Sequence, residues 1–472
     1  MQQNSRKRYL LINTVLFAIN SIGTRIITFL LVPLYTNVFS TAEYGVIDLI
    51  TTIGIILVPI ITVNIGEAVM RFSLDEDADK TTIASVGVFF SAISFLLGSI
   101  VVFTWNFFPQ IGINKWVVYL YCVSQGLYIT FSCNLRGQEK LAQFAIGNII
   151  HTFAVATLNI VLLIYVKLGV NGYFGAYIIS NIVTVLYCIV VGDVIEVLKR
   201  FRLRRELMKS MIAYSIVLVP NSLMWWIMNS SDHIMVTSMI GAAANGIYAV
   251  SYKIPSILSS LSTVFNQAWS YSAIKENKSE DKEAFNNNMF DMLVSFQLIV
   301  TVFLMFIIKP FLKIYVQESY YEAWKYTPYL LTGYFFLTMG TFLSTQYTVN
   351  KDSKGFLLSG TIGAIINIVL NALLIPKFKI HGAAFATCIS YISVFLYRVI
   401  DTKKYIKINV FWGKYVIGYV ILIITAITMF VPGRAGISLL LVELLSILIL
   451  YRKFLIIIST SISGLVKYKI KR

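Results

Sequence analysis

The chain has 472 residues, of which 57% are hydrophobic and 13% charged, and its formal net charge is +17. Soluble domains carry about 25% charged residues, so this composition excludes an ordinary soluble protein. The positive excess can indicate nucleic-acid binding. Here it flanks the apolar runs instead, above all in residues 199–205. Membrane insertion and contact with anionic headgroups explain it, and we expect membrane lipids and no nucleic acid as partners.

In chain order, the apolar runs predict an all-α polytopic membrane protein with about fourteen transmembrane helices. The first run follows Arg6–Arg8, is too long for a signal peptide and lacks a small-residue cleavage site, so we interpret it as a membrane helix that is not cleaved. The expected spans are 10–36, 45–69, 82–108, 116–135, 141–166, 173–192, 211–239, 246–273, 288–308, 323–348, 356–375, 381–400, 415–431 and 437–458.

The loops give the orientation. Most of the 39 Lys and Arg residues fall at the N-terminus, at the C-terminus and in the loops after even-numbered spans. Because cytoplasmic loops are enriched in Lys and Arg, both termini are predicted to be cytoplasmic. We therefore expect a multi-pass protein of the cell membrane.

Spans 1–6 and 7–12 resemble each other. Residues 163–180 align on residues 373–390 without a gap, with identical residues that include Gly172 and Gly382. An even number of spans per copy predicts a parallel repeat of two six-helix bundles, with the substrate site between them. The expected division is 1–200 for the first bundle, 201–405 for the second, and 406–472 for two additional helices and a cytoplasmic tail.

Charged residues within spans are costly and indicate function. Arg25 lies deep in span 1, and Asp48, which could neutralise it, is expected at a different depth. A ligand or cavity role for Arg25 is therefore favoured over a structural salt bridge. Glu67 and Arg71, near the inner end of span 2, are four residues apart and predict a local ion pair. Arg71 could also attract an anion at the cytoplasmic mouth.

Spans 7 and 8 place Asp232 and Lys253 at matched depths, so the two could form an ion pair. Whether this pair would be structural or functional stays open. Span 8 also carries a polar stripe at helical spacing, which suits a hydrated cavity. Its members are Lys253, Ser256, Ser260, Thr263 and Gln267. In span 5, by contrast, Asn148 and Asn159 share a face and favour hydrogen bonds between helices.

Catalytic and metal-binding patterns are missing from the sequence. The four cysteines lie in apolar segments, the three histidines are scattered, and there is no Walker A loop. We therefore expect no metal site, no cofactor and no enzymatic activity. One alternative remains, because the run Asp75–Asp79 contains an Asp-x-Asp element that some glycosyltransferases use to hold a metal ion.

Motifs in the first seventy residues resemble the start of bacterial Wzx-type oligosaccharide flippases. These flippases form the polysaccharide branch of the multidrug/oligosaccharidyl-lipid/polysaccharide (MOP) exporter superfamily, which also contains the MATE transporters. The motifs are Asn20-Ser21, residues 29–36, Glu43-Tyr44-Gly45 and Arg71-Phe72, with Gly246-x-Tyr248 and Lys253-Ile254-Pro255 in the second half.

The resemblance implies translocation of an undecaprenyl-diphosphate-linked oligosaccharide from the inner to the outer leaflet by alternating access. In such a protein of the bacterial inner (cell) membrane, Arg25 and Lys253 would bind the diphosphate and Arg71 would attract it at the cytoplasmic mouth. Ser256, Ser260 and Gln267 would bind the sugars. Asp48 and Asp232 are candidates for an ion pair or for coupling to H+ or Na+. The pathway's glycan polymerase and glycosyltransferases would be partners, with capsule, O-antigen and teichoic-acid precursors all open as substrates. The alternatives are a multidrug cation antiporter of the same superfamily and a membrane-embedded glycosyltransferase.

Overall fold

The computed structural model describes residues 23, 26–104, 113–275, 279–411, 413–457 and 459–460. Within them every regular element is helical. Seven helical segments are long and apolar enough to cross a membrane, and the segments Ile26–Val38 and Gly413–Thr428 are apolar but shorter. In the described residues, each predicted span from the second to the fourteenth is helical over most of its length. The all-α polytopic fold is therefore confirmed.

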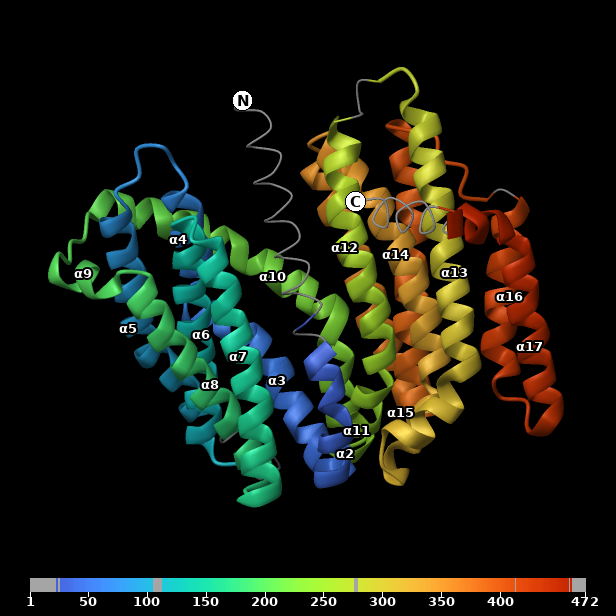
Figure 1. Ribbon diagram of the computed structural model, residues 1–472, viewed down its shortest axis with the longest axis horizontal. Coiled ribbons are helices and arrows are strands. Elements are labelled where there is room, and N and C mark those ends of the chain that lie inside the picture. Colours follow the sequence, from blue (N-terminus) through green and yellow to red (C-terminus); the bar gives the residue numbers. More distant parts are fainter. Residues whose placement is uncertain are drawn as a thin grey trace, which may run out of the picture. The chain divides into compact units, whose positions relative to one another are not determined.

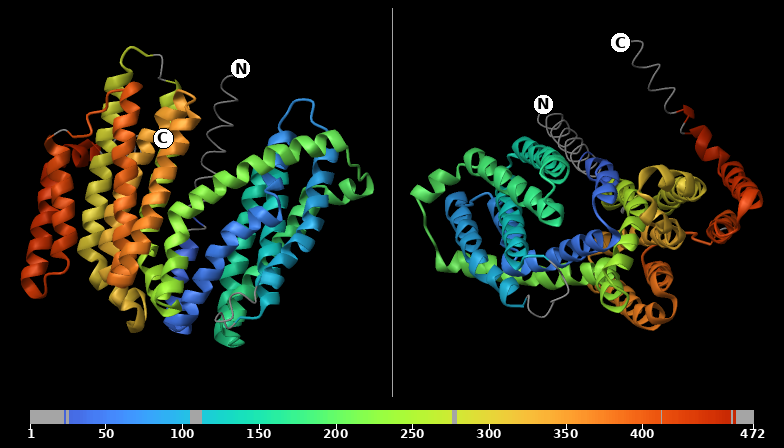
Figure 2. Two further views of the ribbon diagram at one scale, coloured as in Figure 1. Left: turned by 180° about the vertical axis from the view of Figure 1, so that it is seen from behind. Right: turned by 90° about the horizontal axis from the view of Figure 1, so that it is seen from below.

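The chain forms two compact units, an N-terminal unit, Met1–Thr237, and a C-terminal unit, Ser238–Arg472. In the N-terminal unit α5, α6, α7 and α8 run side by side (Figures 1 and 2). Its helices are α2 (Val32–Val38), α3 (Thr41–Ile61), α4 (Ile65–Ser73), α5 (Lys80–Thr104), α6 (Lys115–Gly137), α7 (Leu141–Ile160) with its π-helical end η2 (Val161–Tyr165), α8 (Gly169–Val191), α9 (Val194–Lys199) and α10 (Arg205–Met239).

In the C-terminal unit α14 packs against both halves of the long helix α15, and α13 packs against α14, α16 and α17. The boundary between the units lies in the last turn of α10, whereas the predicted repeat boundary at residue 200 stays a prediction. The elements are α11 (Ala242–Ser251), α12 (Lys253–Lys275), α13 (Lys282–Tyr315), η4 (Glu318–Lys325), α14 (Thr327–Val349), α15 (Ser353–Asp401), η5 (Thr402–Lys404), α16 (Gly413–Thr428) and α17 (Gly433–Leu450).

Three interruptions refine the predicted spans. Span 2 is two helices, because Val63 and Asn64 adopt positive φ values of 51° between α3 and α4. Span 8 breaks at Tyr252, because Pro255 has no N–H for an i−4 hydrogen bond in the first turn of α12. Spans 11 and 12 meet at Lys379 (φ 51°, ψ −131°), where α15 turns back on itself. The sequence pattern predicted apolar length correctly but missed the breaks within spans 2 and 8.

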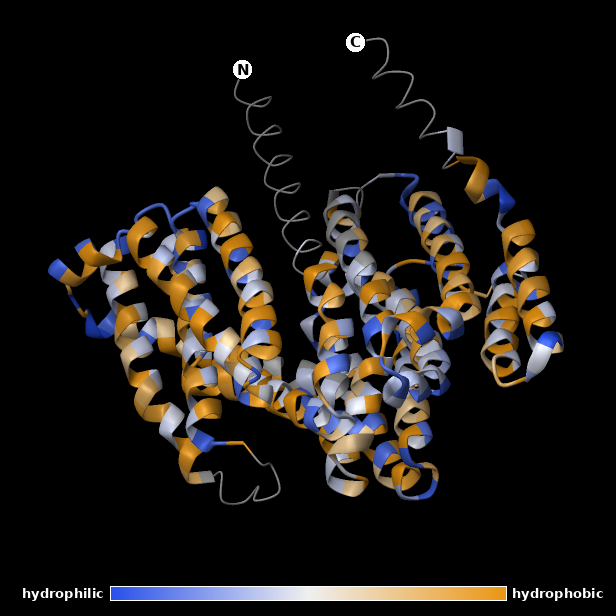
Figure 3. Ribbon diagram, turned by 60° about the horizontal axis from the view of Figure 1, so that its bottom comes forward, coloured by the Kyte–Doolittle hydropathy of each residue, from blue (hydrophilic) through white to orange (hydrophobic). Residues whose placement is uncertain are grey.

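Apolar residues follow most helices along their length in both units, while hydrophilic residues gather at helix ends and in loops (Figure 3). Many large apolar side chains are exposed on α7 and α8, for example Phe153 at 60% and Leu186 at 57%. Exposure on this scale suits contact with lipid tails, because a bilayer does not penalise it. The protein is therefore a multi-pass membrane protein.

Candidate functional site

The long helix α10 is bonded to α3 and to the turn after it at successive points within the N-terminal unit. Ser215 Oγ donates to the carbonyl of Asn64 (3.4 Å), and Trp226 Nε1 donates to the carbonyl of Thr52 (2.9 Å). Further along α10, His233 meets Asp48. Because residue numbers rise along α10 while they fall along α3, the two helices run antiparallel.

Asp48 and His233 form a buried acid–imidazole pair inside an apolar span. His233 Nδ1 lies 2.6 Å from Asp48 Oδ2, and the side chains of His233 and Asp48 are 9% and 16% exposed, respectively. Asp232 is buried next to the pair, and its Oδ1 accepts a hydrogen bond from the backbone N–H of His233 (3.0 Å). Buried carboxylates in a membrane span need such partners, because solvation by water is lost there.

The two acidic coupling candidates, Asp48 and Asp232, thus lie together around His233. Sequence reasoning treated the three histidines as scattered and missed this one. The available signal was its position directly after Asp232 in a mid-span segment. The arrangement can accept or release a proton within the membrane, since a carboxylate and an imidazole share one short contact.

The polar stripe begins at Lys253, the first residue of α12. The hydroxyl of Ser256 donates to the carbonyl of Lys253 (2.7 Å), and that of Ser260 donates to the carbonyl of Ser256 (2.6 Å). Both side chains are half-buried, and their oxygens can still accept hydrogen bonds. The side chain of Gln267 lies outside the described residues.

Arg25 also lies outside the described residues, so its diphosphate-binding role stays a prediction. The same holds for pairing between Asp232 and Lys253, which belong to different units. Neither the stripe nor Arg25 therefore has an established ligand.

Arg71 does not pair with Glu67 as predicted. Its Nη1 lies 2.6 Å from Asp75 Oδ1, and both side chains are about half exposed. The cause is the end of α4, which leaves Asp75 one turn beyond Arg71, where it can turn back toward the guanidinium. Asp79 of the same acidic run caps the start of α5 by accepting from Thr82 N (3.1 Å). Asp75 and Asp79 therefore both serve local structure, and no cluster of potential metal ligands occurs in the described part of the chain.

Two further charged residues within the predicted spans escaped the sequence reasoning. Arg398 is 1% exposed, and its guanidinium donates to Ser359 Oγ and to the Gly340 carbonyl, each at 3.0 Å. Glu443 of α17 accepts a hydrogen bond from Thr428 (2.7 Å), while its Oε2 is buried without a hydrogen-bond partner. In the sequence Arg398 lies so close to the basic loop after span 12 that it counts with that loop, and Glu443 is a lone charge in an otherwise apolar run.

Comparison with known proteins identifies the family. The family model for polysaccharide biosynthesis proteins matches residues 10–271, more than half of the chain. The chain belongs to this family. The predicted membership of a polysaccharide biosynthesis family is therefore confirmed. No curated protein matches this chain in sequence.

Solved structures share the fold of this polysaccharide biosynthesis protein. The lipid II flippase MurJ, in an inward closed conformation, aligns with a TM-score of 0.68 at 16% identity, covering 95% of this chain and 99% of that one. An inward-facing multidrug resistance MATE family transporter of the MOP superfamily aligns with a TM-score of 0.65 at 11% identity, covering 82% and 97%. A MOP superfamily transporter from Pyrococcus furiosus gives 0.57 at 13%, covering 88% and 96%. At these identities the likeness concerns the fold.

Proposed function

We propose that this protein is a flippase that moves an undecaprenyl-diphosphate-linked oligosaccharide from the cytoplasmic to the outer leaflet by alternating access. The observation that carries the proposal is its family, whose model describes polysaccharide biosynthesis proteins. The fold it shares with a lipid II flippase supports it. The bacterial cell membrane is the proposed location, with both termini cytoplasmic.

The diphosphate would be bound by cations within the membrane. Arg25 can grip phosphate oxygens bidentately, and Lys253 can contribute a point charge. Arg71 would act earlier, as an exposed cation at the cytoplasmic mouth, although it would have to leave Asp75 to do so. Ser256, Ser260 and Gln267 would bind sugar hydroxyls. The glycan polymerase and glycosyltransferases of the pathway are the proposed partners.

The buried pair of Asp48 and His233 favours H+ over Na+ as the coupling ion in this proposal. Na+ binds to several oxygen ligands, whereas one contact of this pair comes from an imidazole nitrogen. A proton can bind to such a pair and change its charge. The carboxylate of Asp232 lies next to the pair and would interact with that charge. Proton binding would then bias the α3–α10 contact and with it the transport cycle.

The function is tested by complementation of a flippase-deficient strain, with protein level checked in membranes. Arg25→Ala and Lys253→Ala should each abolish glycan export at normal expression. Arg25→Lys should retain partial activity, because the charge remains while the bidentate geometry is lost. Arg434→Ala, which removes an exposed cation at the start of α17, is the matched control and should export normally. Full export by Arg25→Ala would contradict its role in binding the diphosphate.

The coupling proposal needs a second assay, in vesicles that carry the purified protein and a fluorescent lipid-linked oligosaccharide. A proton gradient should accelerate flipping by the wild type, and His233→Gln should remove that acceleration while leaving a slow basal rate. Acceleration by a sodium gradient alone would reverse the choice of ion.

The rival within the superfamily is a multidrug cation antiporter, which the fold shared with the MATE transporter supports. Efflux of cationic dyes from cells that express the protein, without any glycan phenotype, would favour this rival.

A further inference from the structure

A pocket of about 320 Å³ lies where three membrane-spanning helices of the N-terminal unit end. The helices α5 and α7 begin there, at Lys80 and Leu141, and α8 ends there at Val191. All three helices satisfy the length and hydropathy expected of a membrane span. The pocket therefore sits at the boundary between the bilayer and water, whichever side of the membrane that is.

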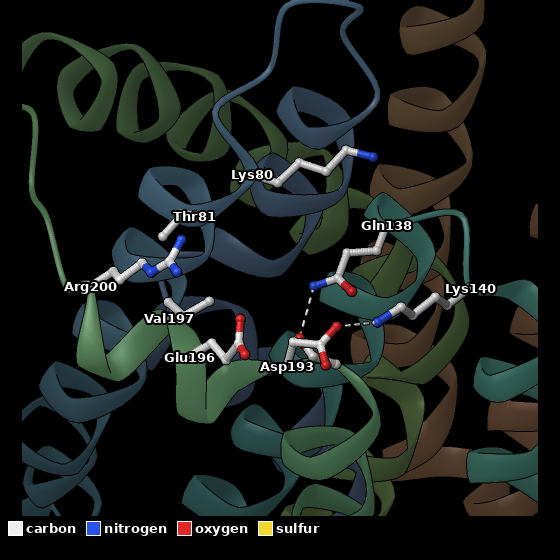
Figure 4. Close-up of a pocket in the computed structure, with 9 residues that line it drawn as sticks. Lys80, Thr81, Gln138, Lys140, Asp193, Glu196, Val197 and Arg200 are labelled. Atoms are coloured by element: carbon white, nitrogen blue, oxygen red, sulfur yellow. Dashed lines mark hydrogen bonds and ion pairs between the residues drawn. The ribbon is translucent and has the colours of Figure 1, made fainter.

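One side of the pocket is held by an ion pair between Lys140 and Asp193. Lys140 Nζ donates to Asp193 Oδ2 (2.6 Å) and to the Val191 carbonyl (2.8 Å), and Gln138 Nε2 donates to the Gly192 carbonyl (2.9 Å). These bonds tie the turn after α6 to the end of α8 (Figure 4). They fix one side of the pocket and neutralise Asp193.

The remaining charges leave the pocket positive. Lys80 and Arg200 line it from the α5 and α9 sides (Figure 4), and both are exposed. Neither has an ion pair with any residue that the structure describes. Glu196 is the one other carboxylate in the lining. These two cations and one carboxylate in the lining leave a net charge of one, which matches a single phosphodiester.

The segment that carries Arg200 also presents apolar side chains outward. On α9, Val194 and Val197 are buried against the unit, whereas Ile195 and Leu198, three residues apart, are 51% and 52% exposed. Phe201, just after α9, is 43% exposed. Apolar side chains next to cationic ones are typical of segments that lie in the membrane interface.

We propose that this pocket binds the headgroup of an anionic phospholipid of the surrounding leaflet. Lys80 and Arg200 hold the phosphodiester, Thr81 lies within the lining to donate its hydroxyl, and Ile195, Leu198 and Phe201 contact the upper part of the acyl chains. Basic pockets at the ends of membrane helices bind anionic headgroups in this way. The site is separate from the residues proposed to carry the oligosaccharide, so it does not depend on what the protein transports.

The test uses the full-length purified protein in nanodiscs that contain phosphatidylglycerol and phosphatidylcholine. Native mass spectrometry after gentle release counts the lipids that stay bound, and titration gives their relative affinities. The wild type should retain phosphatidylglycerol in preference to phosphatidylcholine. Lys80→Gln combined with Arg200→Gln should weaken phosphatidylglycerol binding by about tenfold or more, given the typical contribution of each basic residue near a membrane surface.

Lys199→Gln combined with Arg205→Gln is the matched control, because it removes the same total charge from two residues near Arg200 that do not line the pocket. The control should retain phosphatidylglycerol nearly as the wild type does. An equal loss of phosphatidylglycerol in both double variants would mean that the positive surface as a whole attracts the lipid, and it would refute a specific site in the pocket. The pocket would be equally refuted if the Lys80/Arg200 variant kept its phosphatidylglycerol, or if undecaprenyl diphosphate displaced that lipid at equimolar concentration.

Discussion

Two regions align in sequence, α7–α8 in the N-terminal unit and the two halves of α15 in the C-terminal unit. They agree closely in some details and differ sharply in others. Ser180 and Ser390 are both fully buried, and each donates to the carbonyl four residues earlier, Ala176 or Ala386, at 2.7 Å. Eight residues further on, the same alignment position is occupied by Cys188 in one region and by Arg398 in the other. The burial and bonding of the two serines are thus shared, while the polar groups buried nearby differ.

The N-terminal region uses neutral groups where the C-terminal region uses a cation. Asn181 Nδ2 donates to Ser124 Oγ and Gln125 Oε1, both at 3.1 Å, and its Oδ1 lies 2.9 Å from His151 Nε2. Arg398 instead connects the second half of α15 to Ser359 in its first half and to Gly340 in α14. A buried guanidinium costs more to desolvate than an amide, so the C-terminal connection depends more strongly on its partners.

The largest expected difference is between Arg398→Ala and Cys188→Ala. Arg398→Ala removes two hydrogen bonds and leaves a large cavity, so it should lower the free energy of unfolding by about 2–4 kcal/mol. Cys188→Ala removes a single sulfur and should cost about 1 kcal/mol. Thermal unfolding in detergent, followed by tryptophan fluorescence, measures both.

Arg398→Met separates volume from charge, because it refills most of the cavity without the guanidinium. It should recover a substantial part of the stability that Arg398→Ala loses. Equal melting temperatures for Arg398→Ala and Cys188→Ala would show that the guanidinium contributes nothing beyond its neutral counterpart.

A second difference concerns the buried amides of the two regions. Asn181 bonds to three side chains, whereas Asn371 Nδ2 donates to Asn367 Oδ1 (2.9 Å) and its own Oδ1 lacks a hydrogen-bond partner. Asn181→Ala leaves His151 and Gln125 with unmet hydrogen-bonding capacity and should cost about 2 kcal/mol, against about 1 kcal/mol for Asn371→Ala. Chemical unfolding of the two variants side by side checks the order, and a larger loss for Asn371→Ala would reverse the comparison.

The paired glycines offer a third difference. A Cβ on Gly382 would lie 2.4 Å from the Leu374 carbonyl oxygen, which is backbone and cannot yield easily. A Cβ on Gly172 would lie 3.0 Å from Leu168 Cβ and 3.2 Å from the Leu162 carbonyl. Gly382→Ala should therefore cost about 1–3 kcal/mol, and Gly172→Ala less. Expression level and melting temperature of the two variants test this order. Equal melting temperatures would mean that the backbone at the α15 turn relaxes to accept the added methyl group.

The fold could be predicted well from the sequence because apolar length is a strong local signal. Spans 2–14 were located by it, and the alignment of residues such as Gly172 and Gly382 predicted the repeat. The sites were harder, because they depend on which side chains meet. The contact of His233 with Asp48 joins residues far apart in the chain, and Arg71 pairs with Asp75 rather than Glu67 because α4 ends just before Asp75.

Prediction of the buried amides was mixed for the same reason. Asn148 does accept an interhelical hydrogen bond, from Tyr128 at 2.7 Å, as its face of the helix suggested. Asn159, expected to do likewise, donates to the Val155 carbonyl of its own helix, and its Oδ1 has no hydrogen-bond partner. Helical spacing predicts the face of the helix on which a side chain lies, but it does not predict which atom becomes its hydrogen-bond partner.

The smallest expected effect tests what the two regions share. Ser180→Ala and Ser390→Ala each remove a hydroxyl that bonds only to a carbonyl of its own helix. Alanine has the higher helix propensity and fills nearly the same space, so each change should alter the free energy of unfolding by about 0.5 kcal/mol or less. The two shifts in melting temperature should also agree with each other, since the two serines have the same burial and the same bond. If one variant lost more than about 1 kcal/mol while its counterpart did not, the hydroxyls would have different surroundings and the packing would be less alike than the alignment implies.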